Sequence, residues 1–296
     1  MVNARVALVV LASLFWGLSG GIGGLLMAGG WNAFVVSFYR CAIGLVFVLV
    51  WLALRPGRSG LANRRLWLWS AVAGAGVAGN FGFYFMSIAQ GSVAVAVTLM
   101  YCAPVFVYLV SFVLRLERPT ALKLVAIPLV LLGVLLLTRI YDIGASGVTA
   151  VGVGAGLLAG LSYAVFIFGF KYAASHGSPQ AILSIAFAVS AAVLILPGDV
   201  GQTVAVLRTP DWPLFAGLGV FGAGLSFVFY VIGLRHTAPA VASIVAMVEP
   251  VTASLFGVAV LQELLTGSQV LGMAVILITV TAMSVLSRVG RPASEA

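Results

Sequence analysis

The sequence predicts an all-α polytopic membrane protein with ten transmembrane helices arranged as two inverted repeats of five. Three observations support this fold class: an apolar composition, basic residues confined to one set of loops, and a second half that repeats the first. Of 296 residues, 62% are hydrophobic and 7% are charged, whereas soluble domains carry about 25% charged residues. A chain with so little polar surface is expected to have lipid as its solvent.

The ten spans follow from the positions of charged loops and of Gly and Pro breaks. Residues 66–114 carry no charge over 49 positions, about twice one bilayer span, so this segment is expected to cross twice. No A-x-A-like cleavage site follows the first apolar segment, which we interpret as a retained helix. The shortest segment can span if Lys123 extends to the interface. The expected spans are 5–28, 33–54, 66–89, 92–114, 121–138, 148–171, 179–197, 213–234, 238–261 and 267–287.

Lys and Arg residues predict the orientation. With the N-terminus in the cytoplasm, twelve of them fall on the inner side and two, Arg139 and Arg208, on the outer side. This bias follows the positive-inside rule and predicts an inner-membrane protein with both termini in the cytoplasm. The net charge of +8 therefore indicates topology rather than a nucleic-acid partner. The inner set is Arg5, Arg55, Arg58, Arg64, Arg65, Arg115, Arg118, Lys123, Lys171, Arg235, Arg288 and Arg291.

A shift of 146 residues aligns the two halves of the chain. The stretch NFGFYFMSIAQ, residues 80–90, falls on SFVFYVIGLRH, residues 226–236. Further matches join Pro104 with Pro250, Glu117 with Glu263, and Thr120 with Thr266. Chance similarity between apolar helices is the alternative, and the shared Pro, Glu and Tyr positions argue against it.

Each repeat contains five helices, an odd number, so the second copy enters the membrane from the opposite side. The sequence thus predicts two copies, residues 1–145 and 146–296, that form one membrane domain. Inverted repeats of this kind are typical of secondary transporters.

Two ionisable residues, Arg40 and Glu249, lie well inside predicted spans. Such groups usually face the protein interior or water and have a partner. Their counterparts in the other repeat are Ala186 and Ala103, so each half supplies one charge of opposite sign. In a structural role they pair with each other or with carbonyls freed by Pro250. In a functional role they hold the two ends of a zwitterion, or Glu249 takes up a proton during transport.

Pro104 and Pro250 occupy equivalent positions in the two copies. A proline removes a helical hydrogen bond and clashes with the preceding turn, so both helices are expected to be kinked. The pair is either a tolerated kink or a paired hinge that bends for gating.

Polar and aromatic residues recur on equivalent helix faces. Asn80 and Tyr84 are spaced i, i+4 and share one face, and Ser226 with Tyr230 repeats it. Such faces suit a cavity for an amphipathic solute, although ordinary helix packing is the alternative. The same hypothesis extends to four further candidates for the substrate site, namely Trp16, Tyr163, Tyr101 and Met247.

Small residues and two span-end acids are interpreted as structural. Gly152, Gly156 and Gly160 form one stripe, and Gly20 with Gly24 forms another. Both stripes are expected to pack within the fold, because small residues let helices approach closely. Glu117 and Glu263 precede the next helix, where a carboxylate complements the helix dipole.

Several motifs carry no chemistry here. Gly217–Gly222 matches GxGxxG but lies within an apolar span with no preceding strand. Gly17–Gly20 matches the GxSG of intramembrane serine proteases, but both histidines lie at loop edges. No P-loop and no metal-ligand spacing occur, and Cys41 and Cys102 are interpreted as small core residues. We therefore expect no cofactor, no metal and no enzymatic activity.

The chain resembles the drug/metabolite transporter superfamily, in its ten-helix bacterial exporter branch. The resemblance rests on LFWG at Leu14–Gly17, Arg40 in the second span, Glu249-Pro250 in the ninth, and Glu-x-x-Thr after the fourth and ninth spans. It covers nearly the whole chain and implies export of amino acids, related metabolites or drugs. Aromatic amino-acid exporters are one such group. The first repeat departs from the pattern, because Ala103-Pro104 stands where Glu-Pro is expected.

These observations predict a secondary exporter of small amphipathic metabolites, with amino acids favoured and the tyrosine faces pointing to aromatic ones. Access would alternate through a midplane cavity between the repeats. A passive channel-like facilitator and a multidrug exporter of the same fold are the alternatives. The expected partners are a small-molecule solute and the lipid bilayer; a homodimer is compatible with the sequence but not required. Proton coupling and the exact solute stay open.

Overall fold

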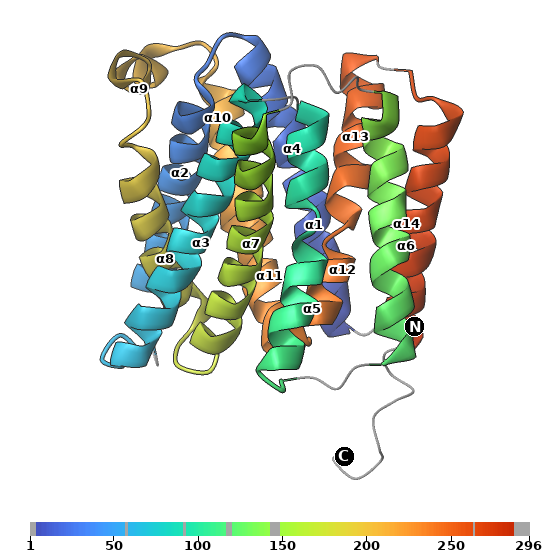
Figure 1. Cartoon of the computed structure of the whole chain (residues 1–296). Coiled ribbons are helices and arrows are strands. Elements are labelled where there is room, and N and C mark those ends of the chain that lie inside the picture. The colour runs from blue at the N-terminus through green and yellow to red at the C-terminus, as the bar shows by residue number, and fades with distance from the viewer. Residues whose placement is uncertain are drawn as a thin grey trace.

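The computed structural model describes residues 4–56, 59–90, 93–116, 120–142, 149–262 and 264–286 (Figure 1). Over these ranges the chain is a bundle of helices with no strand. The helices are α1 (Ala4–Ala28), α2 (Ala33–Leu54), α3 (Arg64–Ala89), α4 (Val93–Met100), α5 (Ala103–Val113), α6 (Ala121–Thr138), α7 (Ala150–Ala173), α8 (Pro179–Leu194), α9 (Val200–Ala205), α10 (Trp212–Gly219), α11 (Ser226–Arg235), α12 (Pro239–Val245), α13 (Val248–Leu261) and α14 (Gly267–Leu286). Short turns η1 (Ile140–Asp142) and η2 (Val206–Arg208) and the π-helix η3 (Val220–Leu225) complete them.

The predicted fold class is confirmed. Among the described residues, eight helical segments are long and apolar enough to cross a membrane. The other two predicted spans contain the shorter apolar helices Pro179–Leu194 and Gly267–Met283. Exposed aliphatic side chains lie on the outside of the bundle, for example at Leu124, Leu132 and Ile278. The protein is therefore an all-helical, polytopic membrane protein.

Three predicted spans are interrupted in the membrane. The fourth span divides into α4 and α5 at Tyr101 and Cys102, and the ninth divides into α12 and α13 at Ala246 and Met247. Both breaks lie just before the expected prolines, where the missing N–H of proline leaves one turn without its α-helical bond. The eighth span contains η3 between α10 and α11, although its counterpart within α3 is a continuous α-helix.

Helix caps also recur at the repeat offset. Asn32 caps α2 by accepting from the amides of Phe34 and Val35, and Ser178, 146 residues later, caps α8. Thr120 caps α6 through its hydroxyl. The acidic residues Glu117 and Glu263 lie outside the described residues, as do Arg58, Arg118, Arg288 and Arg291.

The packing of the second half mirrors that of the first. Helix α3 packs against α7 and α8, while the α10–α11 segment packs against α1 and α2. Helices α6 and α14, the last of each half, pack against each other at one side of the bundle (Figure 1). This exchange of contacts is what two related copies would produce, and the division into residues 1–145 and 146–296 stays a prediction.

The two glycine stripes have different environments. In α7, a Cβ added at Gly160 would lie 3.0 Å from the carbonyl oxygens of Leu99 and Met100, so this stripe packs closely against α4, as expected. A Cβ added at Gly20 or Gly24 would meet no atom within 4 Å. The packing role expected for Gly20 and Gly24 is therefore wrong.

Candidate solute-binding cavity

A cavity of about 490 Å³ lies in the middle of the bundle. We call the end of the bundle that contains Ala4 the proximal end and the end that contains Ala28 and Ala33 the distal end. The cavity runs from Glu249, near the middle of the bundle, to Met27 and Val93 at the distal end, where both side chains are exposed. It therefore opens distally, and its volume lies within the range of small-molecule sites, about 300–1,000 Å³.

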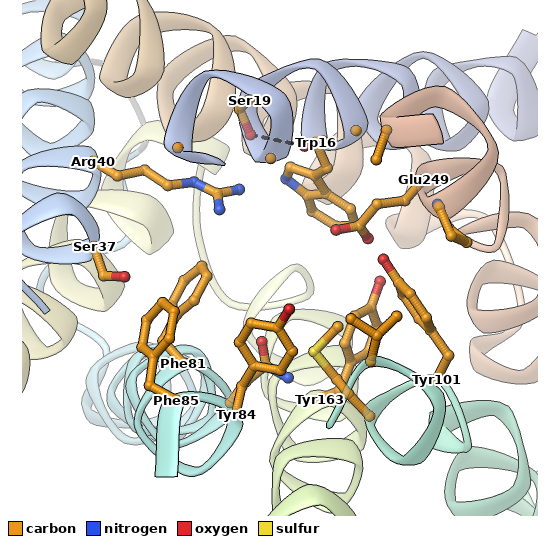
Figure 2. Close-up of a pocket in the computed structure, with 18 of the residues that line it drawn as sticks. Trp16, Ser19, Ser37, Arg40, Phe81, Tyr84, Phe85, Tyr101, Tyr163 and Glu249 are labelled. Atoms are coloured by element: carbon orange, nitrogen blue, oxygen red, sulfur yellow. Dashed lines mark hydrogen bonds between the residues drawn. The ribbon is translucent and has the colours of Figure 1, made fainter. Parts of the chain in front are cut away.

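Polar and aromatic side chains from both halves line this cavity (Figure 2). Helices α1, α2, α3 and α4 contribute most of the wall, and α7 and α13 contribute the part nearest the middle. The polar and aromatic lining residues are Trp16, Ser19, Ser37, Arg40, Asn80, Phe81, Tyr84, Phe85, Tyr101, Thr138, Tyr163, Phe166, Phe227, Glu249 and Ser254.

Arg40 supplies the positive charge of the cavity. Its Nε and Nη2 both donate to the carbonyl oxygen of Gly222, at 3.0 and 2.8 Å, and its guanidinium lies 5.0 Å from the ring centre of Phe81. Gly222 belongs to the π-helix η3, so this carbonyl is not one of those freed by Pro250. Figure 2 shows the rest of the guanidinium directed into the cavity, where a carboxylate could receive two hydrogen bonds.

Glu249 supplies the negative charge, on the opposite wall (Figure 2). Its Oε2 is buried without a hydrogen-bond partner, and the hydroxyls of Tyr101 and Tyr163 point toward its carboxyl group. Within the described ranges, Arg40 and Glu249 form no ion pair; the one found there joins Arg139 and Asp142 near the distal end. Direct pairing of Arg40 and Glu249, one of the sequence alternatives, is therefore not present.

Three buried polar atoms of the cavity wall lack a partner among the described residues: Trp16 Nε1, Tyr163 Oη and Glu249 Oε2. Leaving a buried donor or acceptor unpaired costs about 1–3 kcal/mol, and such groups in native structures are usually satisfied. All three residues line the cavity, so these atoms are candidates for contacts with a polar group inside it.

An aromatic cluster closes the cavity on its proximal side. It consists of Trp16, Tyr163, Phe166, Phe170, Phe187, Phe227 and Tyr230. Trp16 lies 4.8 Å from Tyr230 and 5.0 Å from Phe227, measured between ring centres. Below the cluster, the Nζ of Lys171 donates to the carbonyls of Leu234 and Thr237, which joins the proximal ends of α7 and α11.

The two repeats contribute unequally to this closure. Phe166 and Phe187, in the second repeat, correspond to Gly20 and Cys41 in the first. Gly20 lines the cavity and has open space beside its Cα. The ring of Phe166 therefore fills space on the proximal side of the cavity, whereas Gly20, the equivalent residue on the distal side, leaves that space open.

The structure brings seven of the ten predicted binding and charge residues to the cavity: Trp16, Arg40, Asn80, Tyr84, Tyr101, Tyr163 and Glu249. Ser226, Tyr230 and Met247 are fully buried and do not line it. Of the two predicted hinge prolines, Pro250 lines the cavity and Pro104 is buried in α5.

Other lining residues were missed by sequence reasoning. Ser37 could have been found, since it precedes Arg40 by three residues and so shares its helix face. Phe81 and Phe227 are equivalent positions in the two aligned stretches, 80–90 and 226–236, but the alignment alone assigns them no site role. Phe85, Thr138 and Ser254 carry no comparable signal. Among the described residues, no group of three or more His, Cys, Asp or Glu side chains is placed to hold a metal ion.

Comparison with known proteins agrees with this architecture. The EamA-like transporter family matches residues 4–139 and again residues 150–285. The chain is 34% identical, over 66% of its length, to an uncharacterized transporter of Archaeoglobus fulgidus, 68% of which is covered. It is 25% identical, over 99% of its length, to the uncharacterized transporter YwfM of Bacillus subtilis, 98% of which is covered. A crystal structure with 19% identity superposes with a TM-score of 0.81, covering 98% of this chain and all of the other, and shows a shared fold.

A bundle of membrane-spanning helices around a solute-sized cavity defines a membrane transporter rather than an enzyme. The two family matches begin at residues 4 and 150, which is the offset of 146 seen in the sequence. The chain belongs to the EamA-like transporter family, within the drug/metabolite transporter superfamily. It is a multi-pass membrane protein that handles a small-molecule solute in the lipid bilayer.

Proposed function

We propose that the protein is a secondary exporter of small zwitterionic, amphipathic metabolites, with aromatic amino acids as its preferred solutes. The arrangement of Arg40 and Glu249 on opposite walls of one cavity carries this proposal (Figure 2). Arg40 binds the carboxylate of the solute, and Glu249 binds its ammonium group. The rings of Phe81, Tyr84 and Trp16 between them stack on the side chain.

The orientation of the solute follows from the position of the two charges. Arg40 lies in the distal third of α2, whereas Glu249 lies at the inner limit of the cavity. The carboxylate therefore faces the distal opening and the ammonium group faces the aromatic cluster. The hydroxyl of Tyr163, which points toward the carboxyl group of Glu249 (Figure 2), accepts a hydrogen bond from the ammonium group.

Transport proceeds by alternating access between the two repeats. The positive-inside bias supports an inner-membrane location with cytoplasmic termini, so the distal opening faces outward, in a state that has released its solute. The cavity ends at the aromatic cluster, which argues for a carrier over a continuously open pore. Pro104 and Pro250, next to the helix breaks, act as the hinges.

Counterflow in proteoliposomes tests the solute class. Radiolabelled L-phenylalanine is expected to accumulate in vesicles preloaded with unlabelled L-phenylalanine, L-tryptophan or L-tyrosine, but poorly in vesicles preloaded with phenethylamine or 3-phenylpropionate. Arg40→Met should abolish discrimination against the amine, and Glu249→Gln should abolish discrimination against the acid. Equal transport of all five compounds would contradict recognition of a zwitterion, and absence of trans-stimulation would indicate a passive facilitator.

Proton coupling through Glu249 is tested separately. If this carboxyl group takes up a proton during transport, Glu249→Gln should make the rate of L-phenylalanine efflux independent of pH between about 5 and 8. The wild-type rate should change over the same range. If the variant transports with the wild-type pH profile, Glu249 does not carry the coupling proton.

A further inference from the structure

The cavity uses only one of two equivalent faces that the repeat supplies. Asn80, Tyr84 and Tyr101 line it from the first repeat. Their counterparts at the offset of 146 are Ser226, Tyr230 and Met247, and all three are fully buried. Each pair divides in the same way, with the first-repeat member facing the cavity and the second-repeat member covered.

The covered face contains polar atoms without partners. Ser226 Oγ and Tyr230 Oη make no hydrogen bond within the described residues. They share one helix face of α11, being four residues apart. Tyr230 is covered by aromatic rings, with ring centres 4.8 Å away at Trp16 and 6.5 Å away at Phe170. These rings give its hydroxyl no acceptor.

We propose that Ser226 and Tyr230 form the solute contacts of a second state, open at the proximal end, and that the aromatic cluster covering them is the proximal gate. This inference rests on the alternating access of the proposed function. Exchange of the conformations of the two inverted repeats exposes the second-repeat face and buries the first. In that state a bound solute or water satisfies the two hydroxyls.

The backbone next to this face is suited to such a movement. The π-helix Val220–Leu225 ends directly before Ser226, and its looser hydrogen bonding often marks functional sites. Arg40 bonds the carbonyl of Gly222 within this turn, from the distal part of the cavity. A solute carboxylate that binds Arg40 would compete with the carbonyl of Gly222 for its hydrogen bonds. Binding would thereby loosen the π-helix that positions Ser226 and Tyr230.

The gate is closed at two levels, by aromatic rings and by hydrogen bonds. Phe170 contacts Phe166, Phe227 and Tyr230 through ring packing alone. Nearer the proximal end, the bonds from Lys171 to the carbonyls of Leu234 and Thr237 hold α11 against α7. Separation of α7 from α11 at these two levels uncovers Tyr230.

Cysteine accessibility tests this proposal independently of the identity of the solute. In a Cys41→Ser, Cys102→Ser background, three serines are replaced singly: Ser226→Cys as the test, Ser254→Cys at the cavity wall, and Ser190→Cys as a buried control. Ser190 is fully buried and bonds the carbonyls of Gly74 and Ala186. Each variant is exposed, from one side of the membrane at a time, to a membrane-impermeant methanethiosulfonate reagent.

Ser254→Cys should react from the distal side, and Ser190→Cys from neither side. Ser226→Cys should react from the proximal side only, and at least about fivefold faster after Phe170→Leu loosens the gate. Monodisperse gel-filtration profiles establish that each variant is folded. Reaction of Ser226→Cys from the distal side, or no faster than Ser190→Cys in both backgrounds, would overturn the proposal. Proximal labelling without any L-phenylalanine transport would leave this inference intact and refute the proposed solute.

Discussion

Trp16 lies where the cavity meets the aromatic cluster, and it serves both. Its indole ring packs on Phe227 and Tyr230. Its Nε1–H lies at the wall of the cavity and has no hydrogen-bond partner among the described residues. Ring packing and hydrogen bonding are therefore separable at this position. Phenylalanine removes the donor and keeps only part of the ring packing, because its ring is smaller than indole.

For Trp16→Phe, we expect a modest fall in thermal stability, because the smaller ring leaves part of the buried space unfilled, and about fivefold weaker solute binding. The loss corresponds to one hydrogen bond, about 1 kcal/mol, and a factor of ten corresponds to about 1.4 kcal/mol. Thermal unfolding in detergent and the KM for L-phenylalanine counterflow give the two readouts. A large fall in melting temperature with an unchanged KM would show that Trp16 acts only in packing.

Arg40 illustrates how a partly buried cation can hold the fold and still face a cavity. One side of its guanidinium is held by the carbonyl of Gly222 and by Phe81, while the other side faces the cavity (Figure 2). The planar fork of arginine makes this possible, and lysine cannot reproduce it.

Arg40→Lys should lower the free energy of unfolding by about 1–3 kcal/mol, because two charge-assisted hydrogen bonds to Gly222 are replaced by at most one. Reversible unfolding in mixed micelles measures the difference. Arg208→Lys, at an exposed position in η2, is the matched control and should be unchanged. Equal stability of Arg40→Lys and wild type would mean that the bonds to Gly222 do not stabilise the fold.

At the scale of the element, helix α7 owes its close approach to α4 to its glycines. At Gly160, an added Cβ would lie 3.0 Å from two backbone carbonyls, which cannot rotate away. At Gly154, on the same helix, an added Cβ would meet nothing within 4 Å. The two positions therefore separate close packing from helix propensity.

Gly160→Ala is expected to destabilise the protein by about 1–3 kcal/mol through overpacking. Gly154→Ala should be neutral or stabilising by up to about 1 kcal/mol, since alanine is the better helix former. Unfolding midpoints of the two variants in the same detergent give the comparison. Equal destabilisation by both substitutions would mean that the close approach of α7 to α4 at Gly160 does not contribute to stability.

The elements themselves were largely predictable. Lipid imposes a length on every span, and charged loops mark the ends, so α2 begins and ends where expected, at residues 33 and 54. Proline chemistry predicted the breaks before Pro104 and Pro250. It did not predict the π-helix at Val220–Leu225, because this segment contains no proline. A proline is also no certain sign of a break, since Pro128 lies inside the continuous helix α6. That irregularity depends on tertiary contacts such as the one from Arg40.

At the scale of the whole molecule, the repeat predicted which residues are equivalent but not which of them face the cavity. Asn80 and Tyr84 lie on its wall, whereas Ser226 and Tyr230 are covered. Sequence symmetry treats both pairs alike, and only the adopted conformation separates them. The absence of a direct Arg40–Glu249 pair could not be predicted either, because it depends on the distance between α2 and α13.

The conformational difference between the repeats predicts a kinetic asymmetry. Exchange of L-phenylalanine across the membrane should be several times faster than its net efflux, because the empty carrier returns slowly. Gly20→Phe should reduce this ratio if it lets the distal side close without solute. Parallel measurements of exchange and net efflux in proteoliposomes give the ratio, with Gly154→Ala as the control. A ratio of one in the wild type would contradict the asymmetry.

We attribute this expected asymmetry to the open space beside Gly20, whose equivalent residue in the second repeat is Phe166. When the distal side closes over an empty centre, nothing fills that space, and a void of aromatic size costs about 3–5 kcal/mol. In the mechanism we propose, an aromatic solute fills this space. The solute then forms part of the hydrophobic core that encloses it. The closed state with solute bound is therefore more stable than the closed state without it.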